Sequence, residues 1–201
     1  QGMTAEIPRR TDTGPFGDAA QQRSEDPTGF YSESGNGCRG ALNTMAMWFR
    51  NDAHADGSSG WIFHHRPAVG AASGEARGPA FLRRGGNQVT FRVEREDFTV
   101  GAIGAGWHFA VGVVDDTNTP TTGFADIRVW VDGVLRLESE VEMPGDSIVG
   151  GSLRFFAGVN TFNTLFQYAR GVALAEVMGW DEPLTVAEVQ DLNERVFANV
   201  P

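Results

Sequence analysis

The stretch Ala125–Glu142, ADIRVWVDGVLRLESEVE, decides the fold class of this chain. Apolar residues alternate with polar residues on both sides of Asp132-Gly133, which is the pattern of two half-buried strands. An Asp-Gly pair favours a two-residue type I′ turn, because both central residues need a positive φ. The apolar residues of the first strand then share one face, and Arg128 and Trp130 share the other. We therefore predict an antiparallel hairpin here.

Further short apolar runs surround this hairpin and end in one helix. Thr185 and Glu188 form a capping box ahead of an apolar stripe at helical spacing, so we expect a helix to begin there. About ten strands and one helix predict an all-β fold, a two-sheet antiparallel jelly-roll sandwich with one short C-terminal helix. The expected strands lie at residues 44–49, 60–64, 80–83, 88–93, 98–100, 107–114, 125–131, 134–142, 153–160 and 171–180.

Composition divides the chain and narrows the classes of partner. Residues 1–40 are rich in Gly, Pro and polar residues, so we expect an N-terminal extended arm there and one domain over residues 41–201. The formal net charge is −10, which disfavours nucleic acid and anionic membranes as partners. No apolar run is long enough to cross a bilayer, so we expect no membrane insertion.

Three stretches carry a resemblance to a known superfamily. They are WHFAV at residues 107–111, IRVWVDG at residues 127–133 and AEVMGWDEPLTVAEVQDL at residues 175–192. In order and spacing they resemble motifs of the laminin G-like, concanavalin A-like lectin/glucanase superfamily. The resemblance implies the jelly-roll fold. It leaves function open, because that superfamily includes glycan binders, adhesion modules, glycanases and virion proteins.

Sugar-binding sites usually place an exposed aromatic side chain beside polar side chains, and we chose the candidate ligand-binding residues by that rule. Trp130 shares the polar face of its strand with Arg128, and a polar loop follows further along the chain. The candidates are Arg128, Trp130, Asn160, Asn163 and Tyr168. The alternative is that Trp130 packs beneath the arm or a loop.

A calcium site is the candidate cofactor site. Asp115, Asp116 and Asn118 follow the end of an expected strand and offer clustered oxygen ligands, which Ca²⁺ prefers. Laminin G-like domains often bind calcium at the rim of the sandwich, so the resemblance points the same way. The alternative is that these residues only cap a turn.

The last candidate chemistry is glycan hydrolysis, which needs two carboxylates close together on one strand face. Glu138, Glu140 and Glu142 alternate along one expected strand, but they lack the apolar setting of such a pair, so a solvated face is the preferred interpretation. We therefore expect no catalysis, and predict a lectin-like module that binds a glycan or protein ligand at a cell, particle or virion surface. One alternative is a virion or surface-lattice protein that assembles as a homo-oligomer or lattice through residues 1–40. A glycan hydrolase or lyase is the second alternative.

Overall fold

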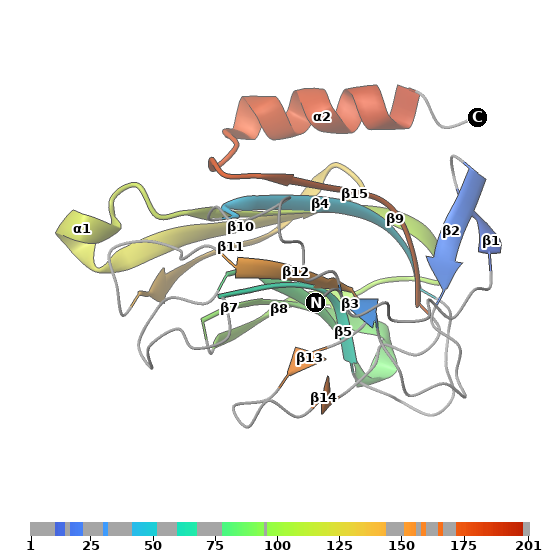
Figure 1. The fold of residues 1–201 in the computed structure, drawn as a ribbon. Coiled ribbons are helices and arrows are strands. Elements are labelled where there is room, and N and C mark those ends of the chain that lie inside the picture. Colours follow the sequence, from blue (N-terminus) through green and yellow to red (C-terminus); the bar gives the residue numbers. More distant parts are fainter. Residues whose placement is uncertain are drawn as a thin grey trace.

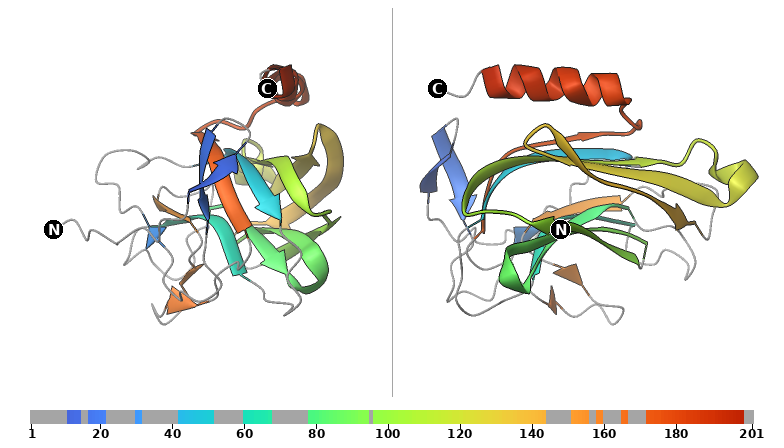
Figure 2. Two further views of the ribbon diagram at one scale, coloured as in Figure 1. Left: turned by 90° about the vertical axis from the view of Figure 1, so that its right-hand side faces the viewer. Right: turned by 180° about the vertical axis from the view of Figure 1, so that it is seen from behind.

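The computed structural model describes residues 11–14, 17–21, 30–31, 42–51, 60–67, 78–94, 96–143, 151–155, 158–159, 165–166 and 172–198. Two antiparallel sheets pack face to face, and the C-terminal helix lies outside one of them (Figures 1 and 2). This arrangement confirms the predicted jelly-roll sandwich.

The described strands form two large sheets and one small one. The seven-stranded sheet has the order β1 (Thr11–Gly14), β2 (Gly17–Gln21), β15 (Val172–Trp180), β4 (Thr44–Asn51), β9 (Gly106–Asp115), β10 (Phe124–Val131) and β11 (Val134–Glu142). The six-stranded sheet has the order β3 (Phe30–Tyr31), β12 (Gly151–Phe155), β5 (Gly60–Pro67), β6 (Ala80–Arg84), β7 (Gln88–Val93) and β8 (Glu96–Ala102). A small hairpin joins β13 (Gly158–Val159) to β14 (Leu165–Phe166), and the helices are α1 (Thr119–Thr122) and α2 (Val186–Ala198).

The hairpin that decides the fold forms as predicted. Asp132 has a φ of 52° and Gly133 a φ of 75°, which is the positive pair that a type I′ turn requires. The pairing shifts by one residue between Val129 and Trp130, so Arg136 is the extra residue of a β-bulge on β11.

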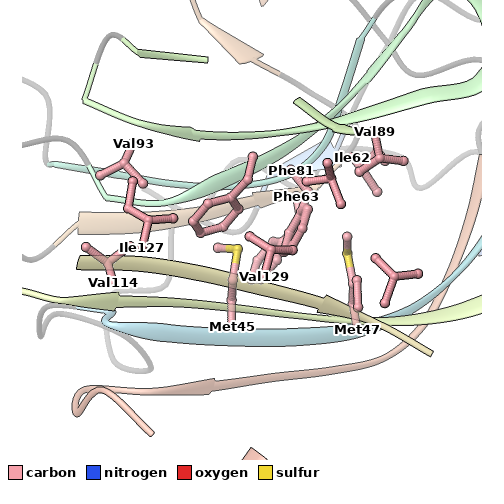
Figure 3. Close-up of a cluster of buried hydrophobic side chains, with 14 of the residues drawn as sticks. Met45, Met47, Ile62, Phe63, Phe81, Val89, Val93, Val114, Ile127 and Val129 are labelled. Carbon is pink, nitrogen blue, oxygen red and sulfur yellow. The ribbon is translucent and has the colours of Figure 1, made fainter. Parts of the chain in front are cut away.

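The space between the two sheets is filled by apolar side chains from both. Met45 and Met47 of β4 face Phe81 and Val89 of the six-stranded sheet (Figure 3). Gly112 of β9 lies at the tightest point. A Cβ atom there would approach Phe91 Cε2 to 2.4 Å, so the two sheets can pack this closely only because the residue is glycine.

The helix α2 begins as the capping box predicted. Glu188 accepts a hydrogen bond from the Thr185 N–H at 2.8 Å, and the Glu188 N–H donates to Thr185 Oγ1 at 3.3 Å. Its apolar stripe packs on the outer side of the seven-stranded sheet, where Val189 and Leu192 join a second buried cluster. The helix therefore covers the part of this face that β4, β9, β10 and β15 form.

The described parts of residues 1–40 form three short strands, and the extended arm over the whole segment stays a prediction. Strands β1 and β2 form a hairpin, and β2 pairs with β15, with Leu174 opposite Ala20. Strand β3 pairs with β12 in the other sheet. These three strands belong to the sandwich of their own chain.

Candidate functional site

The structure buries Trp130, and the prediction that it offers an exposed aromatic plate is wrong. Only 3% of this residue is exposed, and it lies in the cluster beneath α2 with Trp48 and Phe109. Phe197 of α2 closes the same cluster, with its ring 5.4 Å from that of Trp48. The stated alternative was burial beneath the arm or a loop, whereas the segment that covers Trp130 is the helix α2.

Arg128 lies beside Trp130 and is engaged by carboxylates. Its Nε atom lies 3.1 Å from Glu138 Oε1, and its Nη2 atom lies 3.7 Å from Asp126 Oδ2. The prediction that the glutamates of β11 are solvated is confirmed for Glu138, Glu140 and Glu142, which are all exposed. Arg128 thus crosslinks an edge hairpin at its surface.

Three further candidates, Asn160, Asn163 and Tyr168, lie outside the described residues. The strands on either side of residues 160–164 are described. Strand β13 contacts β5, and the β13–β14 hairpin lies on the side of the six-stranded sheet that faces away from α2 (Figures 1 and 2).

The three candidate calcium ligands lie at the end of β9 and in the turn that follows it, where both carboxylates accept hydrogen bonds from the protein. Asp115 Oδ1 accepts from Thr117 Oγ1 at 2.6 Å, and Asp116 Oδ1 accepts from Asn43 Nδ2 at 2.7 Å. Asn118 precedes α1 without a side-chain cap. Among the described residues, no three His, Cys, Asp or Glu side chains gather as a metal site would require. Calcium at this turn stays a prediction.

The side of the six-stranded sheet turned away from α2 carries a charged cluster that the sequence analysis missed. We call the part of this side formed by Arg84, Arg92 and Asp97 the arginine face, and Ala80, Leu82 and Thr90 beside it are buried. These residues alternate with core residues of the same strands, such as Phe81 and Phe91. In the described part of the chain no helix lies over this side, but the β13–β14 hairpin lies on it (Figure 1).

Asp97 is the centre of that cluster, because two arginines meet on its carboxylate. Arg92 binds it through both Nε and Nη2, with the Nη2 atom 2.8 Å from Asp97 Oδ2. Arg84 reaches the same Oδ2 atom from the neighbouring strand through its Nη2 atom. Each of the three side chains is about one-third exposed, between 29% and 32%. The cluster is thus oriented, carries a net positive charge and faces solvent.

Charge is divided unequally between the two sheets. The six-stranded sheet carries five arginines and two acidic residues in its strands. The seven-stranded sheet carries three arginines and eight acidic residues, and α2 adds three acidic residues and one arginine. The negative charge of the whole chain therefore does not extend to the strands of the arginine face.

A second polar cluster fixes the end of the sandwich at the β10–β11 turn. His108 Nδ1 lies 2.8 Å from Asp132 Oδ2, and His108 Nε2 lies 3.0 Å from the Gly104 carbonyl oxygen. Both partners are acceptors, so the protonated imidazole, in which both ring nitrogens donate, is the form that makes both hydrogen bonds. The hydrogen bond with Asp132 raises the pKa of His108. Partial burial acts to raise the pKa of Asp132, but the hydrogen bonds from His108 and the Phe109 N–H outweigh it and lower that pKa.

Comparison with known proteins identifies the fold and no family. No family model matches the sequence, and no curated protein matches it either. A Trypanosoma rangeli sialidase solved with sialic acid has a TM-score of 0.54 at 11% identity, over 76% of this chain and 23% of that one. A heptameric SAP-like pentraxin from Limulus polyphemus has a TM-score of 0.53 at 13% identity, over 79% and 73% of the two chains.

The binding domain of a botulinum neurotoxin, solved with rat synaptotagmin II, has a TM-score of 0.53 at 11% identity, over 76% of this chain and 35% of that one. This chain thus spans about a quarter of the sialidase and a third of the toxin domain. The shared fold is the jelly-roll sandwich. The finer resemblance to laminin G-like domains stays a prediction.

No helix in the described part of the chain is long and apolar enough to cross a bilayer. The arginine face escaped the sequence analysis because its three charged residues come from three strands. The sequence did hold a signal, because Arg84, Arg92 and Asp97 lie on three successive strands that are joined by short turns. Reading it required the strand register, which pairs Arg92 with Asp97 directly.

Proposed function

We propose that this chain is a non-catalytic recognition module that binds a glycan or a protein ligand through the arginine face. The observation that carries the proposal is the pair of arginines that Asp97 orients at the surface of the six-stranded sheet. On the seven-stranded sheet, α2 covers the cluster of Trp48, Phe109 and Trp130, and the space between the sheets is filled by the core. Neither of these two places can admit a ligand.

The arginine face has the properties that recognition requires. Its donors stand on neighbouring strands of one sheet, and Asp97 holds both guanidinium groups in place. Groups held in position before binding lose little conformational entropy when a ligand arrives. Solved proteins of this fold include ones bound to sialic acid and to rat synaptotagmin II, which supports both ligand classes. The proposal places this surface outside a cell or on a particle, as we expect from the sequence.

The test is a binding screen with the whole chain on a glycan array and against cell-surface protein extracts. Arg84→Ala should weaken the binding that the wild type shows. Arg136→Ala is the matched control, because Arg136 is also a surface arginine but lies on β11 of the other sheet. Equal loss in both variants would show that overall charge, and not the arginine face, carries the binding.

The same screen also tests the calcium prediction. Binding is measured with added Ca²⁺ and with a chelator, and an Asp115→Asn variant is included. If the predicted site at the β9–β10 turn serves the ligand, the chelator and the variant lower binding to the same extent. Binding that neither change affects would overturn the calcium prediction.

A further inference from the structure

We propose that the arginine face selects acidic glycans, that is, polysaccharides that carry carboxylate or sulfate groups, and that Arg84 is the main contact with the anion. This inference rests on the proposed function and names the ligand class of the same surface. It is carried by the contacts of the arginine cluster, by its charge and by the strand register.

The contacts leave Arg84 free to bind a second anion. Arg92 holds Asp97 in the two-pronged arrangement, whereas Arg84 meets it through the Nη2 atom alone. In the described part of the chain, Asp97 is the one partner of the Arg84 guanidinium. An arginine has five N–H donors in a planar fork that matches carboxylate and sulfate oxygens. Arg84 is therefore held by one edge and offers the other to solvent, with 32% of its side chain exposed.

The cluster carries a net positive charge, which attracts an anion. Two guanidinium groups on one carboxylate leave one positive charge on the arginine face. The strands of this sheet add Arg66 on β5 and Arg154 on β12. Acidic residues gather instead on the seven-stranded sheet, so an acidic ligand is steered toward one side of the molecule.

The strand register places Arg92 and Arg154 on one row across the sheet, with the buried Ala80 between them. Arg92 pairs with Asp97 on one side and with Ala80 on the other, and backbone pairing continues the row from Ala80 through His64 to Arg154. Neighbouring strands lie about 4.8 Å apart, so the positions of Arg92 and Arg154, three strands apart, are separated by about 14 Å. Such a spacing suits a sparsely charged polymer.

Nucleic acid and acidic protein fit this surface less well. A nucleic acid strand carries a charge about every 3.4 Å, far denser than the row of basic positions, and the net charge of −10 opposes it. An acidic protein would need a large, closely fitting patch, whereas the described charged groups of this face are few and only one-third exposed. A glycan chain with isolated anionic groups matches the number and the spacing of these positions.

The experiment compares probes that differ in one property at a time. Binding to dextran, dextran sulfate and polygalacturonate is measured by biolayer interferometry across a range of salt concentrations. A single-stranded oligonucleotide and poly-glutamate serve as the nucleic acid and protein polyanions. We expect dextran sulfate or polygalacturonate to bind, dextran and both other polyanions to bind at least about tenfold more weakly, and the affinity to fall as salt rises.

Variants then locate the binding. Loss of one charge-assisted contact predicts a weakening of about tenfold to a hundredfold for Arg84→Ala. Arg84→Lys keeps the charge without the fork, so its affinity should fall between the two. Arg136→Ala should bind like the wild type, and the thermal unfolding of each variant reports whether it is folded.

Each outcome decides between the two proposals. Equal binding of dextran and dextran sulfate overturns the preference for acidic glycans and leaves the recognition module standing. Equal binding of the oligonucleotide or poly-glutamate overturns the glycan class. Binding of no glycan here and of no glycan or protein in the earlier screen overturns both. Unchanged affinity of folded Arg84→Ala overturns the assignment of Arg84.

Discussion

Replacement of His108 by alanine should destabilise the chain by about 2 kcal/mol near pH 5.5. The variant loses a charge-assisted hydrogen bond to Asp132 and a second hydrogen bond to the Gly104 carbonyl. Bonds of the first kind contribute about 1.5–3 kcal/mol and neutral ones about 1 kcal/mol. The Asp132 side chain is 38% exposed, so solvent screening places the first value at its lower end. For a domain of this size, the melting temperature should fall by about 4–8 °C.

The effect should depend on pH because the pKa of His108 is raised in the folded state. A raised pKa means that the stabilisation is complete below the unfolded value of 6.5 and is lost as pH rises through the folded pKa. The lowered pKa of Asp132 acts in the other direction, so its contribution is present above 3.8 and is lost as pH falls through the folded pKa. The pair therefore stabilises the fold most between these two values.

Urea unfolding at pH 5.5 and pH 9 measures this for the wild type, His108→Ala, Asp132→Asn and the double variant. Asparagine keeps a residue that tolerates the positive φ of the turn, so Asp132→Asn removes mainly the charge. The coupling free energy of the pair should exceed about 0.5 kcal/mol at pH 5.5 and be smaller at pH 9, where a neutral imidazole can donate only one of its two hydrogen bonds. Glu140→Gln, on an exposed position, is the control. A destabilisation by His108→Ala that is equal at both pH values would refute a protonated histidine.

Three further predictions concern packing and the helix cap, and each is measured by thermal and urea unfolding. Gly112→Ala should cost about 1–3 kcal/mol, because the new methyl group meets the buried Phe91 ring, whereas Gly104→Ala, with nothing within 4 Å, should cost far less. Trp130→Ala should cost about 3–5 kcal/mol by opening a cavity beneath α2, and a cost below 1 kcal/mol would show that the helix does not pack there. Thr185→Ala should cost about 1 kcal/mol through loss of the cap, and Thr185→Ser should recover most of it.

The fold was predictable because alternation and turn chemistry are local properties of the sequence. Asp132-Gly133 fixes the hairpin, and the Thr185–Glu188 box fixes the start of the helix. Which face of a strand is covered is not local. Trp130 alternates with Arg128 as an outward residue should, and it does point away from the space between the sheets. Trp130 is buried because the apolar stripe of α2 packs over it.

That stripe was visible in the sequence, and a search for the surface it covers would have excluded Trp130 as a sugar platform. The candidate site was harder to predict for a different reason. Arg84 and Arg92 look like ordinary surface residues until the register brings both of them to Asp97. The N-terminal segment is a third case, because its short strands pair with β15 and β12, which come more than 120 residues later in the chain.

The position of β4 inside the seven-stranded sheet has a consequence for how the chain folds. Trp48 pairs with Phe109 on one side and with Ala175 on the other, and Thr44 Oγ1 donates to the Glu182 carbonyl across 138 residues. Such a high contact order predicts folding in milliseconds to seconds. During synthesis β4 gains its second neighbour only after β15 has left the ribosome. A nascent chain that stops before residue 172 therefore presents β4 as an unprotected edge, prone to aggregation and to capture by chaperones.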